Sequence, residues 1–464
     1  MNHVPALLTI VEWDTRYRQL SGLPGFSGPA YGGPLGRHVK DGDLRLKKLK
    51  FDNSTASLDL WNFLLTENDR LHAARRAGGK IVGAMKDLGT VPVMACSVPG
   101  VTAFYPDGAW WTPCIMDMSE GLLELADSMG IDESFCPVRA MLGAFVNCEH
   151  FPVPDLLVCS AGAVCDDFSA IAQRLENMGF PFLWWEVPSR RPPWRGSKPV
   201  LLPGGFHADR CQVSLVEQEL RRVRRAIEEL SGQRLTDARL KNGIKAANRV
   251  RRALQELRRL AFEAPVSPLP ALELQVAEML AIHFCSDRGE AMRILDGLLR
   301  EVRARARMGV GFGSVDAARV FWVNPVADIR VMNMLEECGG RLCGTDFLFS
   351  HALDLIPTHL PPMQALARMA LADPMVGQAS ERADRICRDA IRFKSEAMII
   401  SKIPGASHCA LESDVISGMV TSRLGIPVLE IEVPPVSDAM ACALRTRLQA
   451  LVETAGKHRR RRNV

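Results

Sequence analysis

Three of the thirteen cysteines stand where the sequence predicts that a helix begins. Cys165 follows the apolar run LLVCSAGAV, Cys409 follows the similar run AMIISKIPGASH, and Cys136 directly precedes Pro137 in DESFCPVRAMLGAF. Proline is favoured at the first position of a helix, so Cys136 is expected to be the residue that caps it. A helix N-terminus exposes backbone N–H groups and a partial positive charge, which lower the pKa of a thiol and suit an anionic iron–sulfur cluster.

Two other kinds of cysteine chemistry need partners that the sequence does not clearly supply. A structural zinc site would need a fourth ligand besides the three thiols. A nucleophilic cysteine would need a paired base, and Asp166 or Asp167 could be proposed for Cys165. Acidic residues in the first turn of a helix are better explained by their favourable interaction with the helix dipole. The histidines considered as a fourth zinc ligand are His408, His150 and His207.

The composition indicates a large protein without a strong overall charge. The chain has 464 residues, of which 47% are hydrophobic, and a formal net charge of +4. This balance does not point to nucleic acid as a partner. The first residues, MNHVPALLTIVEWDTRYRQL, carry charges too early for a signal peptide, and no apolar run is long enough to span a bilayer. We therefore expect a cytoplasmic protein with reduced thiols and no membrane association, in which most other cysteines are small buried side chains.

The order of apolar runs predicts an α/β protein. LLVCSAGAVCDDFSAIAQRLENMGFPFLWWEVP has the pattern strand, helix, strand of a βαβ unit, and AMIISKIPGASHCALESDVISGMVTSRLGIPVLEIEVPP repeats it. We predict two doubly wound parallel-sheet (Rossmann-like) domains flanking a helical segment. The predicted divisions are an N-terminal extension with a helix (1–78), a first α/β domain (79–205), a helical segment (206–310) and a second α/β domain with a C-terminal helix and basic tail (311–464).

Two segments outside the predicted sheets carry more specific expectations. The stretch to about Lys50 is rich in Gly and Pro and shows little periodicity, so it is expected to wrap irregularly over another surface. VSLVEQELRRVRRAIEELSG and TDARLKNGIKAANRVRRALQELRRLAF predict two charged helices that form an α-hairpin at Ser231–Gly232. Their arginines are most simply a solvated face, and the alternative is contact with the phosphates of a nucleotide-bearing substrate.

Several of these segments together resemble the 2-hydroxyacyl-CoA dehydratases and the related ATP-dependent benzoyl-CoA reductases. GVTAFYPDGAWWTPCIMDMSEGLLELADSMGIDESFCPVRAML is similar to the family's segment leading into its first cluster cysteine. FPVPDLLVCSAGAVCDD resembles the segment with the second, and SHCALESDVISGMVTSRLGIPVLEIE the segment with the third. The resemblance begins at about Gly79, and the order and spacing of the segments carry it rather than any one motif.

The resemblance implies a [4Fe-4S] cluster held by Cys136, Cys165 and Cys409, with one iron left open for a thioester or a small oxygen ligand. It implies an acyl-CoA substrate and a separate ATP-dependent activator iron–sulfur protein that delivers one electron at very low potential. In the dehydratases this electron forms a ketyl radical that expels the α-hydroxyl group, and in the reductases it enters an aromatic ring. The chain has the length of the larger, cluster-bearing subunit, which pairs with a homologous smaller subunit or, alternatively, with a second copy of itself.

Departures from the family pattern leave alternatives open. Met94 stands where a glutamate is common in the family, so no role of that glutamate is carried over, and a non-catalytic cluster-carrying homologue is one alternative. Another is a protein of the superfamily's branch that holds a double-cubane cluster and reduces small molecules. The additional cysteines relevant to that alternative are Cys96, Cys114, Cys148 and Cys159. The sequence identifies no catalytic acid or base.

Overall fold

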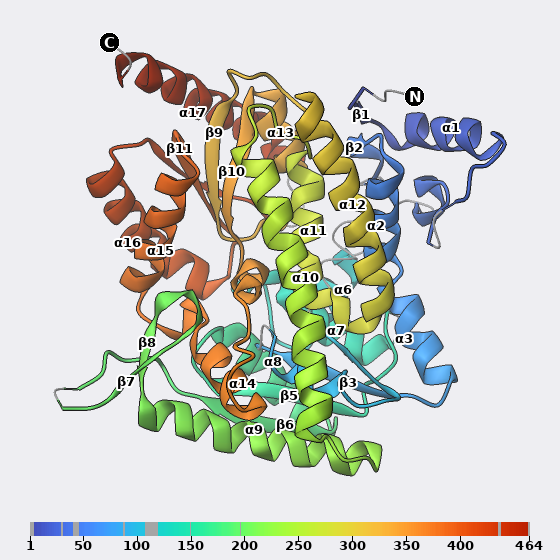
Figure 1. The fold of residues 1–464 in the computed structure, drawn as a ribbon, viewed down its shortest axis with the longest axis vertical. Helices are drawn as coiled ribbons and strands as arrows, with labels where there is room; N and C mark the ends of the chain where they lie inside the picture. Colours follow the sequence, from blue (N-terminus) through green and yellow to red (C-terminus); the bar gives the residue numbers. More distant parts are fainter. Residues whose placement is uncertain are drawn as a thin grey trace.

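Two α/β units are stacked on one another, and a group of long helices runs past both of them (Figure 1). The computed structural model describes residues 4–28, 31–39, 46–86, 89–106, 119–148, 150–194, 196–434 and 438–462. For residues 119–120, 407–410 and 461–462 it describes the backbone alone.

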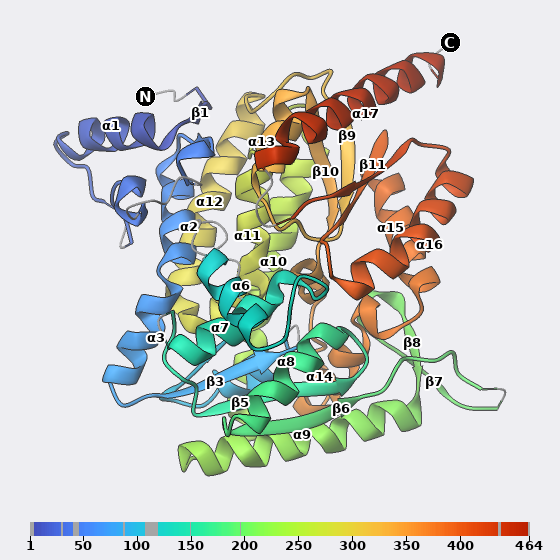
Figure 2. The same cartoon turned by 180° about the vertical axis from the view of Figure 1, so that it is seen from behind.

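The first sheet has four parallel strands in the order β4-β3-β5-β6. They are β3 (Lys80–Met85), β4 (Val101–Phe104), β5 (Leu156–Gly162) and β6 (Phe182–Val187). Helices lie on both of its faces (Figure 2), which is why the central strands are almost continuously apolar. On one side are α6 (Ser119–Ser128), α7 (Ala140–Asn147) and α8 (Asp166–Asn177), and on the other is α9 (Arg210–Ser231).

The second sheet repeats this plan. Its four parallel strands are in the order β10-β9-β11-β12, so the strand that comes first in the chain lies second in each sheet. The predicted α/β class with two doubly wound parallel sheets is confirmed. The strands are β9 (Ala318–Val323), β10 (Gly340–Asp346), β11 (Ala397–Lys402) and β12 (Val428–Glu432), and the helices are α13 (Arg330–Glu337), α15 (Ala379–Arg392), α16 (Ser407–Leu424) and α17 (Ala441–Arg462).

The remaining long helices form a bundle around one fully buried helix. Every residue of α11 (Ala271–His283) is buried. It packs against α2 (Thr55–Leu65), α10 (Asp237–Glu263) and α13, and α12 (Arg288–Met308) in turn packs against α2 and α10. An all-apolar helix would be expected in such a place, but α11 carries buried carboxyl groups that must find partners inside the protein.

The predicted α-hairpin is wrong, although both of its helices are present. α9 packs its apolar stripe on β6 and on α14 (Pro362–Leu371), whereas α10 turns away and packs against α11 and α12 (Figure 1). Each helix has a better apolar partner elsewhere than the neighbouring helix could offer.

The N-terminal part is more regular than its composition suggests. It contains α1 (Ile10–Ser21), whose first turn is closed by a capping box between Thr9 and Glu12. The predicted helix that follows is interrupted at Thr66, so that α2 is followed by α3 (Glu67–Arg76).

Within the described ranges, no helix has both the length and the apolar character needed to cross a membrane.

The smaller elements complete the chain. The short strands are β1 (Leu7–Leu8), β2 (Phe51–Asp52), β7 (Pro199–Leu201) and β8 (His207–Asp209), the short α-helix is α4 (Val91–Ala95), and the 3-10 helices are η1 (Leu35–His38), η2 (Leu46–Lys48), η3 (Pro137–Arg139), η4 (Pro203–Gly205), η5 (Phe284–Ser286), η6 (Leu348–Leu353), η7 (Pro374–Val376) and η8 (Asp438–Met440).

A carboxyl group from the second α/β unit caps the buried helix. Glu336 of α13 accepts a hydrogen bond of 2.8 Å from the backbone N–H of Ala271, the first residue of α11. Part of the Glu336 side chain reaches the surface, but its Oε2 atom is buried. Burial raises the pKa of this carboxyl group to about 8, from an ordinary value of 4.5.

We expect Glu336→Gln to flatten the pH dependence of stability between about pH 5 and pH 8. A carboxyl group whose pKa is higher in the folded chain stabilises it fully only below the unfolded pKa, and this stabilisation is lost as the pH rises through the folded pKa. The loss amounts to about 1.4 kcal/mol for each pH unit in that window. Thermal unfolding midpoints measured at several pH values would show it.

Glu337→Gln is the matched control. Burial raises the pKa of Glu337, but hydrogen bonds from Lys50 and Arg445 outweigh burial and lower it. This substitution should lower stability without flattening the profile between pH 5 and pH 8. Equal pH profiles for Glu336→Gln and the parent chain would show that Glu336 is ionised in the fold.

Candidate functional site

The loop leading into α16 lies directly against the backbone beside Cys136. Gly405 has φ +78°, and a Cβ atom added to it would lie 2.3 Å from the carbonyl oxygen of Phe135 and 2.9 Å from the backbone nitrogen of Cys136. Only glycine fits a contact of this kind at positive φ. Cys409 is the third residue of α16, so this contact brings the N-terminus of its helix close to Cys136.

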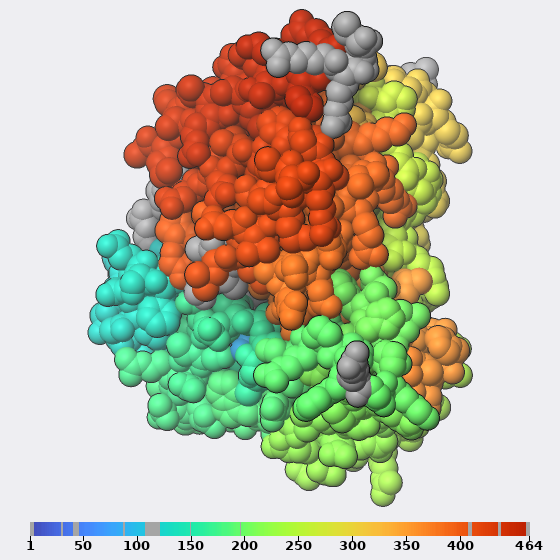
Figure 3. Space-filling model, turned by 90° about the vertical axis from the view of Figure 1, so that its left-hand side faces the viewer, coloured from blue at the N-terminus to red at the C-terminus, as the bar shows by residue number. Residues whose placement is uncertain are grey.

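Cys165 approaches the same place from the first sheet. It is the N-cap residue of α8, and α8 packs against both η3, which Cys136 caps, and α16. Figure 3 shows the contact from outside, with the teal residues of the first unit directly below the orange and red residues of α15 and α16. The structure therefore brings together the three chain segments that carry Cys136, Cys165 and Cys409.

The position of the third thiol lies outside the described side chains. Cys136 and Cys165 are 7% and 5% exposed, so both thiols are shielded from water. Among the described side chains, no group of three or more Cys, His, Asp or Glu is arranged to hold a metal ion. The assignment of the three cysteines to one cluster remains a prediction.

The electrostatic surroundings of Cys165 disfavour a nucleophilic thiolate, although the start of a helix was expected to lower the pKa of this thiol. Its Sγ lies 3.7 Å from Oδ2 of Asp167 and donates toward it. Burial, and next the charge of Asp167, raise the pKa of the Cys165 thiol to about 12. Asp167 thus holds the proton on sulfur instead of activating it as a base. A thiolate at this position needs a cation bound to the sulfur, as an iron atom would supply.

A narrow crevice between the two α/β units begins beside Cys165. Its lining includes Lys86 and Val164, which have φ of +63° and +84° although neither is glycine. Such conformations are strained for residues with a Cβ atom and gather at functional sites. The ammonium group of Lys86 donates to Oγ of Ser169 (2.8 Å). The indole N–H of Trp185, which also lines the crevice, is buried without a hydrogen-bond partner among the described residues.

This crevice lies at the topological switch point of the first sheet. Lys86 directly follows β3, and Val164 follows β5, the strand beside it. After β3 the chain crosses to one side of the sheet, and after β5 it crosses to the other side. The point between two such strands is where ligands bind in open α/β sheets. The buried thiols, the helix N-termini, the unpaired indole donor and the nearby ammonium group fit an anionic cluster in this region.

The other candidate residues lie in different surroundings. Cys96 is buried at the C-cap of α4 and hydrogen-bonds with the buried thiol of Cys285. Cys159 is fully buried in β5, while Cys148 is exposed at the end of α7. Met94 is fully buried in α4. Of the remaining candidates, Cys114 and the side chain of His408 lie outside what the structure describes, His150 precedes β5, and His207 is exposed on β8.

Sequence analysis did not identify a buried arginine that links α16 to the second sheet. Arg382 of α15 is 0% exposed. Its guanidinium group contacts Oδ2 of Asp346 at 2.6 Å and Oε2 of Glu412 at 2.6 Å, and it donates to Oδ1 of Asn324 at 2.8 Å. Glu412 is three residues after Cys409, on the first turns of α16. A local signal exists, since Arg382 lies four residues before Ile386 on the apolar stripe of α15.

Asp346 also connects this arginine to a histidine. Nε2 of His351 lies 3.1 Å from Asp346, and its Nδ1 lies 3.1 Å from Asp373. Burial raises the pKa of Asp346, but the charges of Arg382 and His351 outweigh burial, so this pKa lies well below its usual value. Burial alone would lower the pKa of His351, but the two carboxylates raise it.

A comparison with models of known protein families identifies the family of this chain. A family model described as 2-hydroxyglutaryl-CoA dehydratase, D-component, matches residues 93–455. The chain belongs to this family. Recognition as a member of the 2-hydroxyacyl-CoA dehydratases is therefore confirmed, and the matched range includes all three candidate cysteines. A search of curated proteins found no match.

We expect Gly405→Ala to destabilise this dehydratase component by at least about 2 kcal/mol. The substitution places a methyl group in contact with the Phe135–Cys136 peptide at a backbone conformation that alanine avoids. The matched control is Gly418→Ala on α16, where an added Cβ meets nothing within 4 Å and helix propensity favours alanine by up to about 1 kcal/mol. Thermal unfolding midpoints would separate the two variants, and equal midpoints would mean that the contact at Gly405 does not hold the loop.

Proposed function

We propose that this chain is the larger, cluster-bearing component of a 2-hydroxyacyl-CoA dehydratase or a benzoyl-CoA-reductase-like enzyme. We propose further that Cys136, Cys165 and Cys409 hold one [4Fe-4S] cluster with an open iron. The observation that carries this proposal is the contact between Gly405 and the Phe135–Cys136 peptide, because it places the segments that carry two of these cysteines against one another. The packing of α8 on η3 and α16 adds the third segment.

The residues of the chain would exclude water from the site and would balance the negative charge of a bound cluster. The backbone N–H groups at the starts of α8 and α16 and the ammonium group of Lys86 would balance the negative charge of bound thiolates. Burial of Cys136 and Cys165 would keep water from the site. When bound, the cluster would supply one low-potential electron to an acyl-CoA thioester, giving the ketyl-radical chemistry implied by the resemblance.

The family description names a component, that is, one part of a larger enzyme. We propose that the partners of this chain are a homologous smaller subunit, or a second copy of itself, and an ATP-dependent activator iron–sulfur protein. The protein would act on an acyl-CoA substrate. Dehydration and reduction would use the same cluster and differ in the acyl group.

A double-cubane cluster is the second candidate. It would need more thiolate ligands than the three proposed. Among the additional cysteines that the structure describes, Cys159 is the best placed, because its thiol interacts electrostatically with both Lys86 and Cys165. Cys96 is less well placed, since its thiol is engaged with Cys285. A non-catalytic homologue that keeps the cluster is the third candidate, motivated by Met94 in place of the family's glutamate.

Iron and acid-labile sulfide content would test the proposal. The chain is purified without oxygen, alone and with any co-expressed partner. About four irons per chain are expected, with loss of the cluster in Cys136→Ser, Cys165→Ser and Cys409→Ser. The exposed Cys211 and Cys442 supply matched controls, because their serine variants should keep the parent's iron.

Other results would redirect or overturn the assignment. About eight irons per chain would favour the double-cubane candidate. Four irons without turnover of any 2-hydroxyacyl-CoA or aromatic acyl-CoA, in the presence of partner and activator, would favour the non-catalytic homologue. An iron content that is the same in the parent chain and in all three serine variants would show that these cysteines do not hold the cluster.

A further inference from the structure

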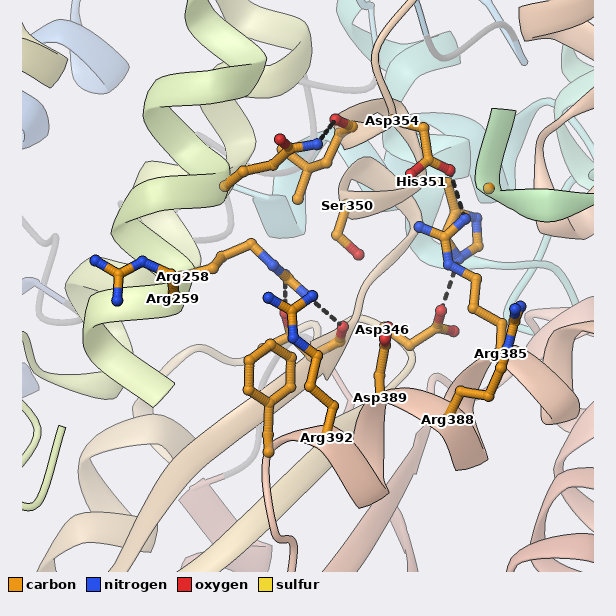
Figure 4. A pocket seen from close by; sticks show the side chains of 15 residues that line it. Arg258, Arg259, Asp346, Ser350, His351, Asp354, Arg385, Arg388, Asp389 and Arg392 are labelled. Atoms are coloured by element: carbon orange, nitrogen blue, oxygen red, sulfur yellow. Dashed lines mark hydrogen bonds and ion pairs between the residues drawn. The ribbon is translucent and has the colours of Figure 1, made fainter. Parts of the chain in front are cut away.

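A second cavity lies at the carboxyl end of β10. It encloses about 430 Å³, which is within the range of small-molecule sites. Thr345 and Asp346 at the end of β10 contribute to its lining, together with Ser350 and His351 of η6. Helices α10 and α15 supply the side walls, and in Figure 4 Arg258 and Arg392 lie on one side of the space and Arg385 and Arg388 on the other. We call this cavity the arginine pocket; its arginines are Arg258, Arg259, Arg385, Arg388 and Arg392.

Three of these arginines already have carboxylate partners. Arg258 contacts the buried Glu278 at 2.5 Å, and Arg385 contacts Asp354 at 2.6 Å. Arg259 makes a two-pronged contact with Glu256, at 2.9 and 3.0 Å. Their charges are therefore largely balanced within the protein.

The two remaining arginines leave an excess of positive charge. Arg388 makes no hydrogen bond or ion pair with any residue in the described ranges. Arg392 has one distant ion-pair partner, Glu263, at 3.8 Å, and its guanidinium group lies 4.9 Å from the centroid of the Phe393 ring. They are four residues apart on α15, and Arg385 lies three residues before Arg388, so three like charges share one face of the helix. Arg388 and Arg392 are exposed, and like charges at this spacing repel one another weakly, so an anion bound beside the row would be favourable.

A carboxyl group between these arginines is itself poorly satisfied. Asp389 lines the pocket but makes no ion pair with the residues that the structure describes. Burial raises its pKa, although Arg385 and Arg258 act in the opposite direction. An anion bound to the arginine row would lie near Asp389 and would compete with its negative charge.

We propose that the arginine pocket binds the phosphate groups of a small-molecule ligand between Arg388 and Arg392. Guanidinium groups match phosphate oxygens with paired hydrogen bonds, and the cavity is large enough for more than one phosphate group. Ser350 and Arg258 also line the inner wall, and both already donate hydrogen bonds within the protein. The position beyond the end of β10 is where ligands of parallel sheets bind.

The phosphate groups have two possible sources. One is the nucleotide part of an acyl-CoA, and this version rests on the proposed function. It is supported by His351, which lines both the arginine pocket and the crevice beside Cys165. The other is a separate phosphorylated ligand, which does not depend on the proposed function.

Binding titrations on the complete chain, purified without oxygen, would test the proposal. The probes are pyrophosphate, CoA and 4′-phosphopantetheine, which lacks the nucleotide. We expect pyrophosphate to bind the parent chain and Arg388→Gln/Arg392→Gln to weaken it by about tenfold or more. Asp389→Asn should tighten binding several-fold, because it removes the competing negative charge. The control Arg307→Gln, at an exposed position of α12, should bind like the parent.

Competition distinguishes the two sources. Displacement of pyrophosphate by CoA but not by 4′-phosphopantetheine would identify the nucleotide phosphates of CoA. Pyrophosphate binding that CoA does not displace would identify a separate phosphorylated ligand. The proposal is overturned if none of the probes binds, or if the double variant binds them as tightly as the parent. Iron content should be equal in the parent and the double variant, so a missing cluster and a missing phosphate site would be told apart.

Discussion

The buried guanidinium group of Arg382 organises the carboxyl edge of the second sheet. Its partners come from the end of β10, from the residue after β9 and from α16, so one side chain joins three parts of the unit. A buried charge is costly unless it is fully paired, and leaving a carboxylate without its partner typically costs about 3–5 kcal/mol. A conformation in which α16 is shifted along the sheet would break the pairing of Arg382 with Glu412 and is therefore strongly disfavoured. Because α16 begins at the loop that contacts Cys136, this arginine also determines how the two units meet.

The two α/β units use the same plan for different purposes. In each, the third strand of the chain, β5 or β11, runs into a loop and then into the helix whose start carries a candidate cysteine. In each, the residue after the first strand has positive φ without being glycine: Lys86 after β3 and Asn324 after β9. Lys86 brings a charge to the crevice beside Cys165, whereas Asn324 accepts a hydrogen bond from Arg382. The same strained position thus serves the candidate site in one unit and the internal framework in the other.

Local patterns predicted what depends on local forces. The apolar runs located β5, β6, β11 and β12, and the cysteines at helix starts followed from the strand–helix order. Packing between distant segments was not predictable in this way. The α-hairpin was wrong because α9 and α10 each find a larger apolar surface elsewhere, and α1 was missed because its capping box lies in a stretch dominated by Gly and Pro. Neither the contact of Gly405 with Phe135 nor the pairing of Arg382 with Asp346 can be derived from sequence spacing, since each joins residues that only the complete fold brings together.

Charge is distributed differently on the two sides of His351. The imidazole group is held between Asp373, which lines the crevice beside Cys165, and Asp346, which lines the arginine pocket and is balanced in turn by Arg382. On the outer side, Arg388 and Arg392 remain without close ion-pair partners among the described residues. A ligand with an anionic end in the arginine pocket and a neutral end toward the crevice would be favoured over the reverse orientation, because desolvating a neutral group costs less than desolvating a charged one. An acyl-CoA has this polarity, with phosphates at one end and a thioester at the other. In this arrangement, the buried ion pairs around His351 would lie between the proposed phosphate site and the chemistry proposed at the cysteines, and would keep the two apart.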